Sequence, residues 1–111
     1  MTIKTLKNLI EKQGATLNKD GKAVDFSSGF QVSKKDCFIL ELKNINEILK
    51  NINGLLKEIR QNEFVGLWVE NGKIYIDISI KIDDLKNAVK FGKEKNQLSI
   101  FNWSTKNCIY L

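Results

Sequence analysis

The clearest pattern along the chain is a pair of alternating apolar and polar runs, residues 63–70 and 73–79, separated by Asn71-Gly72. Asn-Gly is the dipeptide that best suits the two left-handed positions of a type I′ turn. The pattern therefore predicts a two-residue β-hairpin. Its register places six aliphatic residues on one face, as the pairs Val69–Ile74, Leu67–Ile76 and Val65–Ile78.

The other face of this hairpin has a different character. It carries three cross-strand pairs: Trp68–Tyr75, Gly66–Asp77 and Glu70–Lys73. A slip by one residue would exchange the two faces and expose the aliphatic set, so the register is strongly specified. The aliphatic face is expected to join the core, and the second face is where a function would have to show itself.

Three stretches have the 3.6-residue apolar period of a helix. The first covers residues 2–13, with Thr2 as N-cap and Gly14 at the position after the C-cap. The second and longest covers residues 44–62. The third runs from an N-cap at Asp83 to about Lys95. Its predicted buried stripe consists of Ile82, Leu85, Ala88, Val89 and Gly92.

Short extended segments fill the rest of the chain. Residues 15–17 and 22–25 flank the turn sequence Asn-Lys-Asp-Gly, which predicts a small second hairpin. Further strands are expected at 30–32, 38–42, 98–103 and 108–111. We therefore predict one α+β domain spanning residues 1–111, with a mostly antiparallel sheet and about three helices packed as a single layer on one sheet face.

Charge narrows the possible partners only a little. The net charge of +5 is spread along the chain, and 17 of its 18 basic residues are lysine. Dedicated readers of nucleic acid usually use more arginine, because its planar fork makes bidentate contacts. Lys86, Lys90 and Lys93 share one side of the third predicted helix. They form either a solvated face or an electrostatic footprint for an acidic partner, including nucleic acid.

Catalysis has little support in the sequence. The chain has no histidine, and Cys37 and Cys108 lie 71 positions apart with no second cysteine near either. Zinc spacings, P-loops and nucleophile elbows are missing. We expect a non-enzymatic protein without cofactor or metal, with two buried reduced thiols. With no apolar run long enough for a membrane span and no signal-peptide pattern at the N-terminus, a soluble cytoplasmic protein is expected.

Aromatic residues are the better candidates for a function. If Leu98 and Ile100 point toward the helices, Phe101 and Trp103 join Trp68 and Tyr75 on the second sheet face. Two alternatives stay open: a second small core covered by the N-terminal helix or residues 14–33, or a platform for a protein partner or stacked bases. The candidate partner-binding residues are Trp68, Tyr75, Asp77, Phe101, Trp103, Lys86, Lys90 and Lys93.

Four strings of the chain, residues 29–33, 66–79, 96–101 and 109–111, resemble small uncharacterised accessory proteins of phages and conjugative elements from Gram-positive and other AT-rich bacteria. That resemblance implies an accessory gene of a mobile element. Such products are often inhibitors of host defence, including anti-CRISPR proteins, that act by binding. The resemblance thus implies an inhibitor in the bacterial cytoplasm that covers a protein surface or engages a guide RNA, and a protein effector is the partner we expect first. The alternative is a basic nucleic-acid-binding accessory or regulatory protein.

Overall fold

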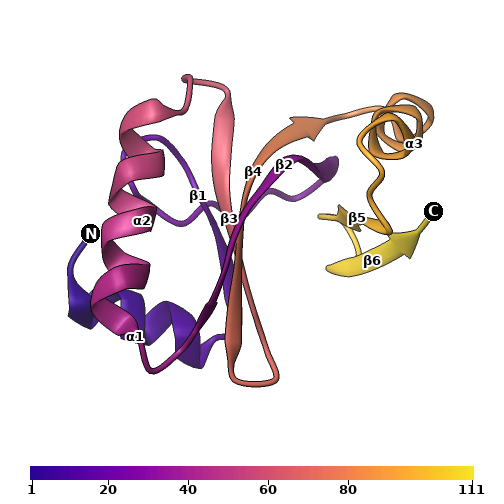
Figure 1. Cartoon of the computed structure of the whole chain (residues 1–111). Helices are drawn as coiled ribbons and strands as arrows, with labels where there is room; N and C mark the ends of the chain where they lie inside the picture. The colour runs from indigo at the N-terminus through magenta and orange to yellow at the C-terminus, as the bar shows by residue number, and fades with distance from the viewer.

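A six-stranded antiparallel sheet with three helices forms the fold, in a computed structural model that describes residues 1–111 (Figure 1). The sheet order is β1-β3-β4-β2-β5-β6. The elements are α1 (Ile3–Glu11), β1 (Gly14–Leu17), β2 (Phe30–Glu41), α2 (Ile45–Glu58), β3 (Glu63–Glu70), β4 (Lys73–Ile82), α3 (Leu85–Glu94), β5 (Ser99–Asn102) and β6 (Asn107–Tyr110). The predicted α+β class with an antiparallel sheet is confirmed.

The central hairpin β3–β4 has the register that its sequence predicts. Trp68 pairs with Tyr75, Gly66 with Asp77, and the aliphatic pairs follow in step. At the turn, Asn71 and Gly72 have φ values of 52° and 75°, which is the left-handed pair that a type I′ turn requires. The alternation of side chains along both strands therefore separates an aliphatic face from an aromatic and polar one.

Helices α1 and α2 cover the aliphatic face of this hairpin. They bring Leu6, Leu9, Ile48 and Ile52 onto the sheet, and Figure 1 shows both helices on the same side of it. The buried strand residues beneath them are Leu17, Val65, Leu67, Ile74 and Ile76. This main core accounts for the amphipathic pattern of both helices, since their charged faces point to solvent.

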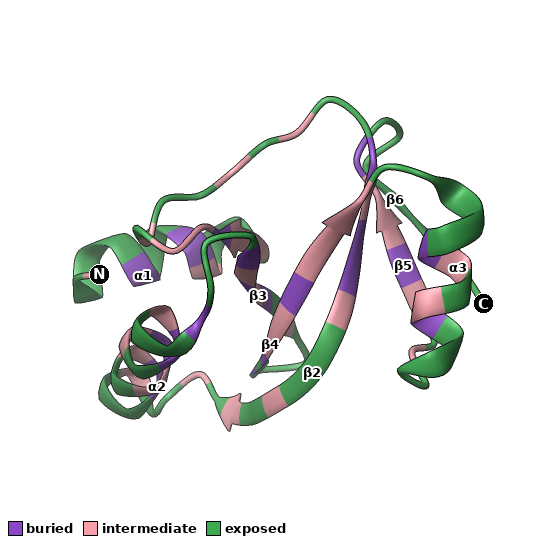
Figure 2. Ribbon diagram, turned by 90° about the horizontal axis from the view of Figure 1, so that it is seen from above, coloured by how far each residue is buried: buried purple, intermediate pink, exposed green.

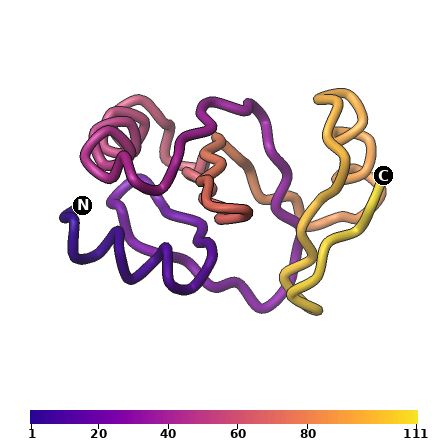
Figure 3. The backbone as a smooth tube through the Cα atoms, turned by 60° about the horizontal axis from the view of Figure 1, so that its bottom comes forward, coloured from indigo at the N-terminus to yellow at the C-terminus, as the bar shows by residue number.

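Helix α3 packs at the other end of the sheet. Its Ala88 contacts Val32 of β2 and Ile100 of β5 in a smaller core. Gly92 lies so close to β5 and the C-terminus that a Cβ added there would be 2.7 Å from Leu111 and 3.1 Å from Ile100. Along β4, one face carries the even-numbered residues from 74 to 82. The first of these pack under α1 and α2 and the last packs under α3, so all three helices cover the same face of this strand. The curl of the sheet nevertheless holds the helices in two separate groups (Figure 3).

Strand β2 differs most from the prediction. The two expected strands at 30–32 and 38–42 form one strand of 12 residues. Irregularities in its register against β4 lie between Ser33 and Lys35 and between Asp36 and Phe38. A β-bulge adds a residue to one strand without ending it, and it shifts which side chains reach each face. Because the bulges interrupt the alternation of apolar and polar residues, the sequence pattern predicted two short strands where the structure has one.

Smaller corrections concern the ends of elements. The N-cap of α3 is Asp84, whose carboxylate accepts from the Asn87 N–H at 2.9 Å, and Asp83 pairs instead with Lys81. Leu85, expected in the buried stripe of α3, is 48% exposed. After α1, Gln13 takes the left-handed conformation, with φ 67°. Gly14, predicted for the position after the C-cap, begins β1 instead.

The expected small hairpin after α1 is reduced in the structure. Strand β1 pairs with β3, and only a single bridge, Leu17 to Ala23, joins it to the following segment. The Asn18 side chain accepts hydrogen bonds from the N–H groups of Asp20 and Lys22, which closes the predicted turn. None of the three helices is both long and apolar enough to cross a membrane.

Candidate functional site

The second face of the sheet is covered at one end. Trp103 is only 6% exposed, and its ring meets Phe26 and Phe101 edge to face at centroid distances of 5.4 and 5.0 Å. Phe26 also meets Phe64 of β3 at 5.7 Å. Phe26 belongs to the segment between β1 and β2, so residues 14–33 supply the cover at this end. Phe101 and Trp103 therefore belong to a second small core.

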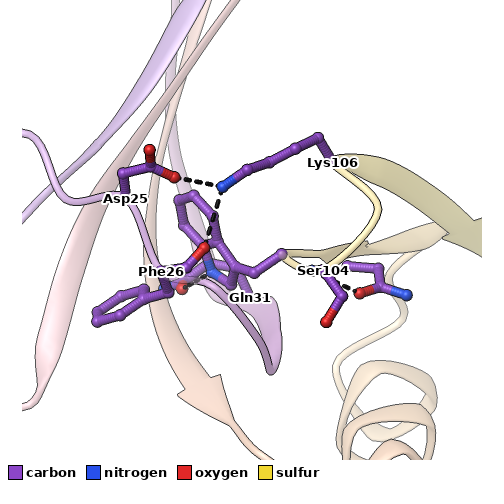
Figure 4. A network of polar contacts seen from close by, with 7 residues as sticks. Asp25, Phe26, Gln31, Ser104 and Lys106 are labelled. Atoms are coloured by element: carbon purple, nitrogen blue, oxygen red, sulfur yellow. Dashed lines mark hydrogen bonds and ion pairs between the residues drawn. The ribbon is translucent and has the colours of Figure 1, made fainter.

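Polar bonds fix this small core in place. Gln31 donates to the Ser79 hydroxyl at 2.8 Å and accepts from the Trp103 indole N–H at 3.0 Å, and all three residues are buried. Above them, the Lys106 ammonium pairs with the Asp25 carboxylate, donates to the Phe26 carbonyl and lies 4.5 Å from the Trp103 ring centroid (Figure 4). Satisfied buried polar groups of this kind rigidify a core.

The other end of the same face is open. Trp68, Tyr75 and Ile39 are register partners across β3, β4 and β2, and their exposed fractions are 55%, 38% and 63%. We call these three residues the open row. It lies next to the hairpin turn at the foot of Figure 1, where no helix covers this side of the sheet. An apolar row this exposed and continuous is typical of an interaction surface rather than of a solvated strand.

A groove of about 580 Å³ runs beside the open row. It is lined by Asp36, Cys37, Phe38, Ile39, Tyr75, Ile76 and Asp77. Most of these walls are apolar, but Asp36 and Asp77 bring two carboxylates to the same place. They are direct cross-strand partners on β2 and β4. Like charges in that position repel each other, so this pair works against the pairing of its own strands.

Asp77 is the least favourably placed charged group in the molecule. Its Oδ1 atom is buried without any hydrogen-bond partner. That oxygen lies over Gly66, where a Cβ would be only 2.1 Å from it, so only glycine leaves room for the carboxylate. Burial raises the pKa of Asp77 to about 6. The nearby Ser33 hydroxyl and Gly66 backbone lower this pKa, whereas the charge of Asp36 raises it further.

The lysines predicted to form a binding surface lie elsewhere. Lys86, Lys90 and Lys93 are exposed on α3, and α3 and the hairpin turn lie at opposite ends of the sheet in Figure 1. Figure 2 shows the outward side of α3 as exposed. The structure therefore divides the eight candidate residues into three groups: the open end with Trp68, Tyr75 and Asp77, the small core with Phe101 and Trp103, and the lysine face of α3.

Both cysteines are free thiols. Cys37 is half-buried at the groove, where desolvation raises its pKa against the lowering effect of Lys35. Cys108 is exposed on β6, which corrects the expectation of two buried thiols. No group of three or more histidine, cysteine, aspartate or glutamate residues is arranged to hold a metal ion.

Sequence reasoning missed two members of the open end, Ile39 and Asp36. Both lie on the bulged strand, where simple alternation fails to assign faces. It also missed Phe26 and Gln31, which complete the small core. The sequence carries no signal for Gln31, because Gln31 and Trp103 lie 72 positions apart and no rule of spacing links them. Comparison with protein-family models, with curated proteins and with solved structures returned no match.

Proposed function

We propose that this chain is a non-enzymatic binding protein that docks a protein partner on the open end of its sheet. The observation that carries the proposal is the open row, in which Trp68, Tyr75 and Ile39 are in register on three adjacent strands and uncovered. Tryptophan and tyrosine are the residues that most often anchor protein interfaces. A groove with apolar walls adjoins them and extends the contact area.

A protein partner fits this surface better than nucleic acid does. Bases stacked on Trp68 and Tyr75 would bring phosphates near Asp36 and Asp77, and the carboxylates would repel them. The lysines that would neutralise phosphates are on α3, at the opposite end of the sheet. Nucleic-acid binding through Lys86, Lys90 and Lys93 is the alternative function, and it would show a steep fall in affinity with salt.

Site-specific photo-crosslinking tests the docking surface. Benzoylphenylalanine introduced in place of Trp68 should give a crosslinked product with a discrete protein in host cells. The same probe in place of Tyr110 is the control, since Tyr110 is an aromatic residue at the other end of the sheet and is even more exposed than Trp68, at 82% against 55%. Equal crosslinking from both positions, or none from position 68, would remove the proposal.

The resemblance to accessory proteins of mobile elements suggests which partner to test first. We propose a protein effector of a host defence system, bound in the bacterial cytoplasm and inhibited in the manner of an anti-CRISPR protein. Expression of the chain should then restore plaque formation by a phage that the host targets. A variant carrying Trp68→Ser, Tyr75→Ser and Ile39→Ser should not restore it. Unchanged plaque counts with the natural chain would reject the counter-defence role while leaving the docking surface to its own test.

A further inference from the structure

The groove beside the open row contains a charge that the protein does not compensate. Ion pairs in the structure join Lys34 to Glu63, Lys43 to Glu41, Lys81 to Asp83 and Lys106 to Asp25. Neither Asp36 nor Asp77 takes part in one. What distinguishes this pair from the other unpaired carboxylates is that Asp36 and Asp77 face each other directly across two strands.

Two features of the geometry are unfavourable to this pair, and a single hydrogen bond offsets them. Asp36 and Asp77 face each other directly across β2 and β4. One oxygen of Asp77 is buried without a partner, against a glycine that leaves it room. The only hydrogen bond to Asp36 comes from the Ser33 hydroxyl, at 3.2 Å. Unfavourable features of this kind persist where a function requires them. The groove lined by Asp36 and Asp77 is the place where a cationic group of a ligand could approach both carboxylates.

We infer that the groove binds an arginine side chain of the protein partner, with its guanidinium between Asp36 and Asp77 and its stem along Tyr75 and Ile39. This inference rests on the proposed function, because it names the chemistry with which a partner would enter the open end.

Arginine fits the surroundings for specific reasons. Its guanidinium donates in a planar fork, which suits two carboxylates on neighbouring strands. It also stacks on aromatic rings and loses less hydration energy on burial than an ammonium does. Tyr75 lines the groove as the register partner of Ile39, and Trp68 follows on the next strand. A hard divalent cation would need about six oxygen ligands, more than two carboxylates and one hydroxyl offer.

The test titrates the intact protein with N-acetyl-arginine amide and follows backbone amide shifts by NMR. Saturable shifts are expected at Gly66, Asp77, Asp36 and Tyr75. The neutral isostere N-acetyl-citrulline amide should give none, and N-acetyl-lysine amide should bind more weakly. Asp77→Asn should weaken arginine binding about tenfold or more, because the removed charge is the buried one. Asp20→Asn, the same change at an exposed aspartate outside the groove, should leave it unchanged.

Each result has a separate meaning. Equal binding of citrulline or lysine, unchanged binding in Asp77→Asn, or no saturable shift at all would overturn the arginine site. Crosslinking from position 68 combined with any of these results would leave the docking surface standing without an arginine anchor. Arginine binding without a crosslinked protein would overturn the proposed function instead, and it would leave a site for a free guanidinium compound.

Discussion

The two ends of the second sheet face differ in their exposure to solvent: one end is covered and the other is open. At one end Trp103 is enclosed by Phe26 and Phe101, and its indole N–H is bonded to Gln31. At the other end Trp68 stands open to solvent beside an uncompensated carboxylate. The difference arises from the segment between β1 and β2, which reaches the first end only. Trp103 therefore contributes to the packing of the fold, whereas the exposed ring of Trp68 fills no space in a core.

The strongest test of this contrast is Trp103→Ala. Removing the ring leaves a cavity among Phe26 and Phe101 and frees the buried Gln31 carbonyl, so the free energy of unfolding should fall by about 3–5 kcal/mol. Urea denaturation followed by circular dichroism measures it. A loss below about 1 kcal/mol would mean that the covered end is not a core.

The second prediction concerns the charge at the open end, where removal should stabilise the fold. The pKa of Asp77 is about 6 in the folded protein and 3.8 in the reference state, so folding takes up a proton between those values. The contribution of Asp77 to stability is therefore most favourable below about pH 4 and is lost as the pH rises through 6. Asp77→Asn should raise the free energy of unfolding at pH 8 by up to about 3 kcal/mol.

The measurement is a pair of urea titrations at pH 5 and pH 8 for each protein. Glu63 has the opposite sign, because Lys34 and the Arg60 N–H lower its pKa and its contribution is lost as the pH falls. The informative quantity is thus the difference between Asp77→Asn and the natural chain, in which Glu63 cancels. A difference that does not grow from pH 5 to pH 8 would contradict the burial of Asp77.

A third prediction sharpens what holds the covered end together. Gln31→Leu keeps a side chain of similar volume but leaves the Trp103 N–H and the Ser79 hydroxyl buried without partners. Stability should fall by about 1–3 kcal/mol, the penalty for an unsatisfied buried group. Gln61→Leu is the matched control, because Gln61 is exposed between α2 and β3. Equal effects of the two changes would show that the polar bonds of the small core contribute nothing.

How far the sequence predicts this molecule depends on the kind of pattern. The hairpin register followed from Asn71-Gly72 and from strict alternation, which are local properties of the chain. Three helices followed from their period for the same reason. The covering of Trp103 by Phe26 did not, because it joins residues 77 positions apart through a segment without regular structure.

The candidate site was predicted in part. Trp68, Tyr75 and Asp77 were found because they lie on the regular hairpin, and the structure brings them together at the open end. Ile39 and Asp36 were not predicted as site residues, because the bulges in β2 break the alternation that assigns a residue to a face. The exposure of one tryptophan and the burial of the other were left open by the sequence, since both alternate to the same face and only the path of residues 14–33 distinguishes them.

The smallest expected effect on stability belongs to Trp68 and is the counterpart of the first prediction. Trp68→Phe should change the free energy of unfolding by less than about 1 kcal/mol, because the lost surface is already half in water. The same variant leaves Trp103 as the only tryptophan, and Trp103→Phe leaves only Trp68. Trp103 alone should emit at shorter wavelength and resist quenching by acrylamide, whereas Trp68 alone should emit at longer wavelength and be quenched readily. Equally weak quenching of the two tryptophans would mean that both ends of the face are covered. The open row would then not be available as a binding surface.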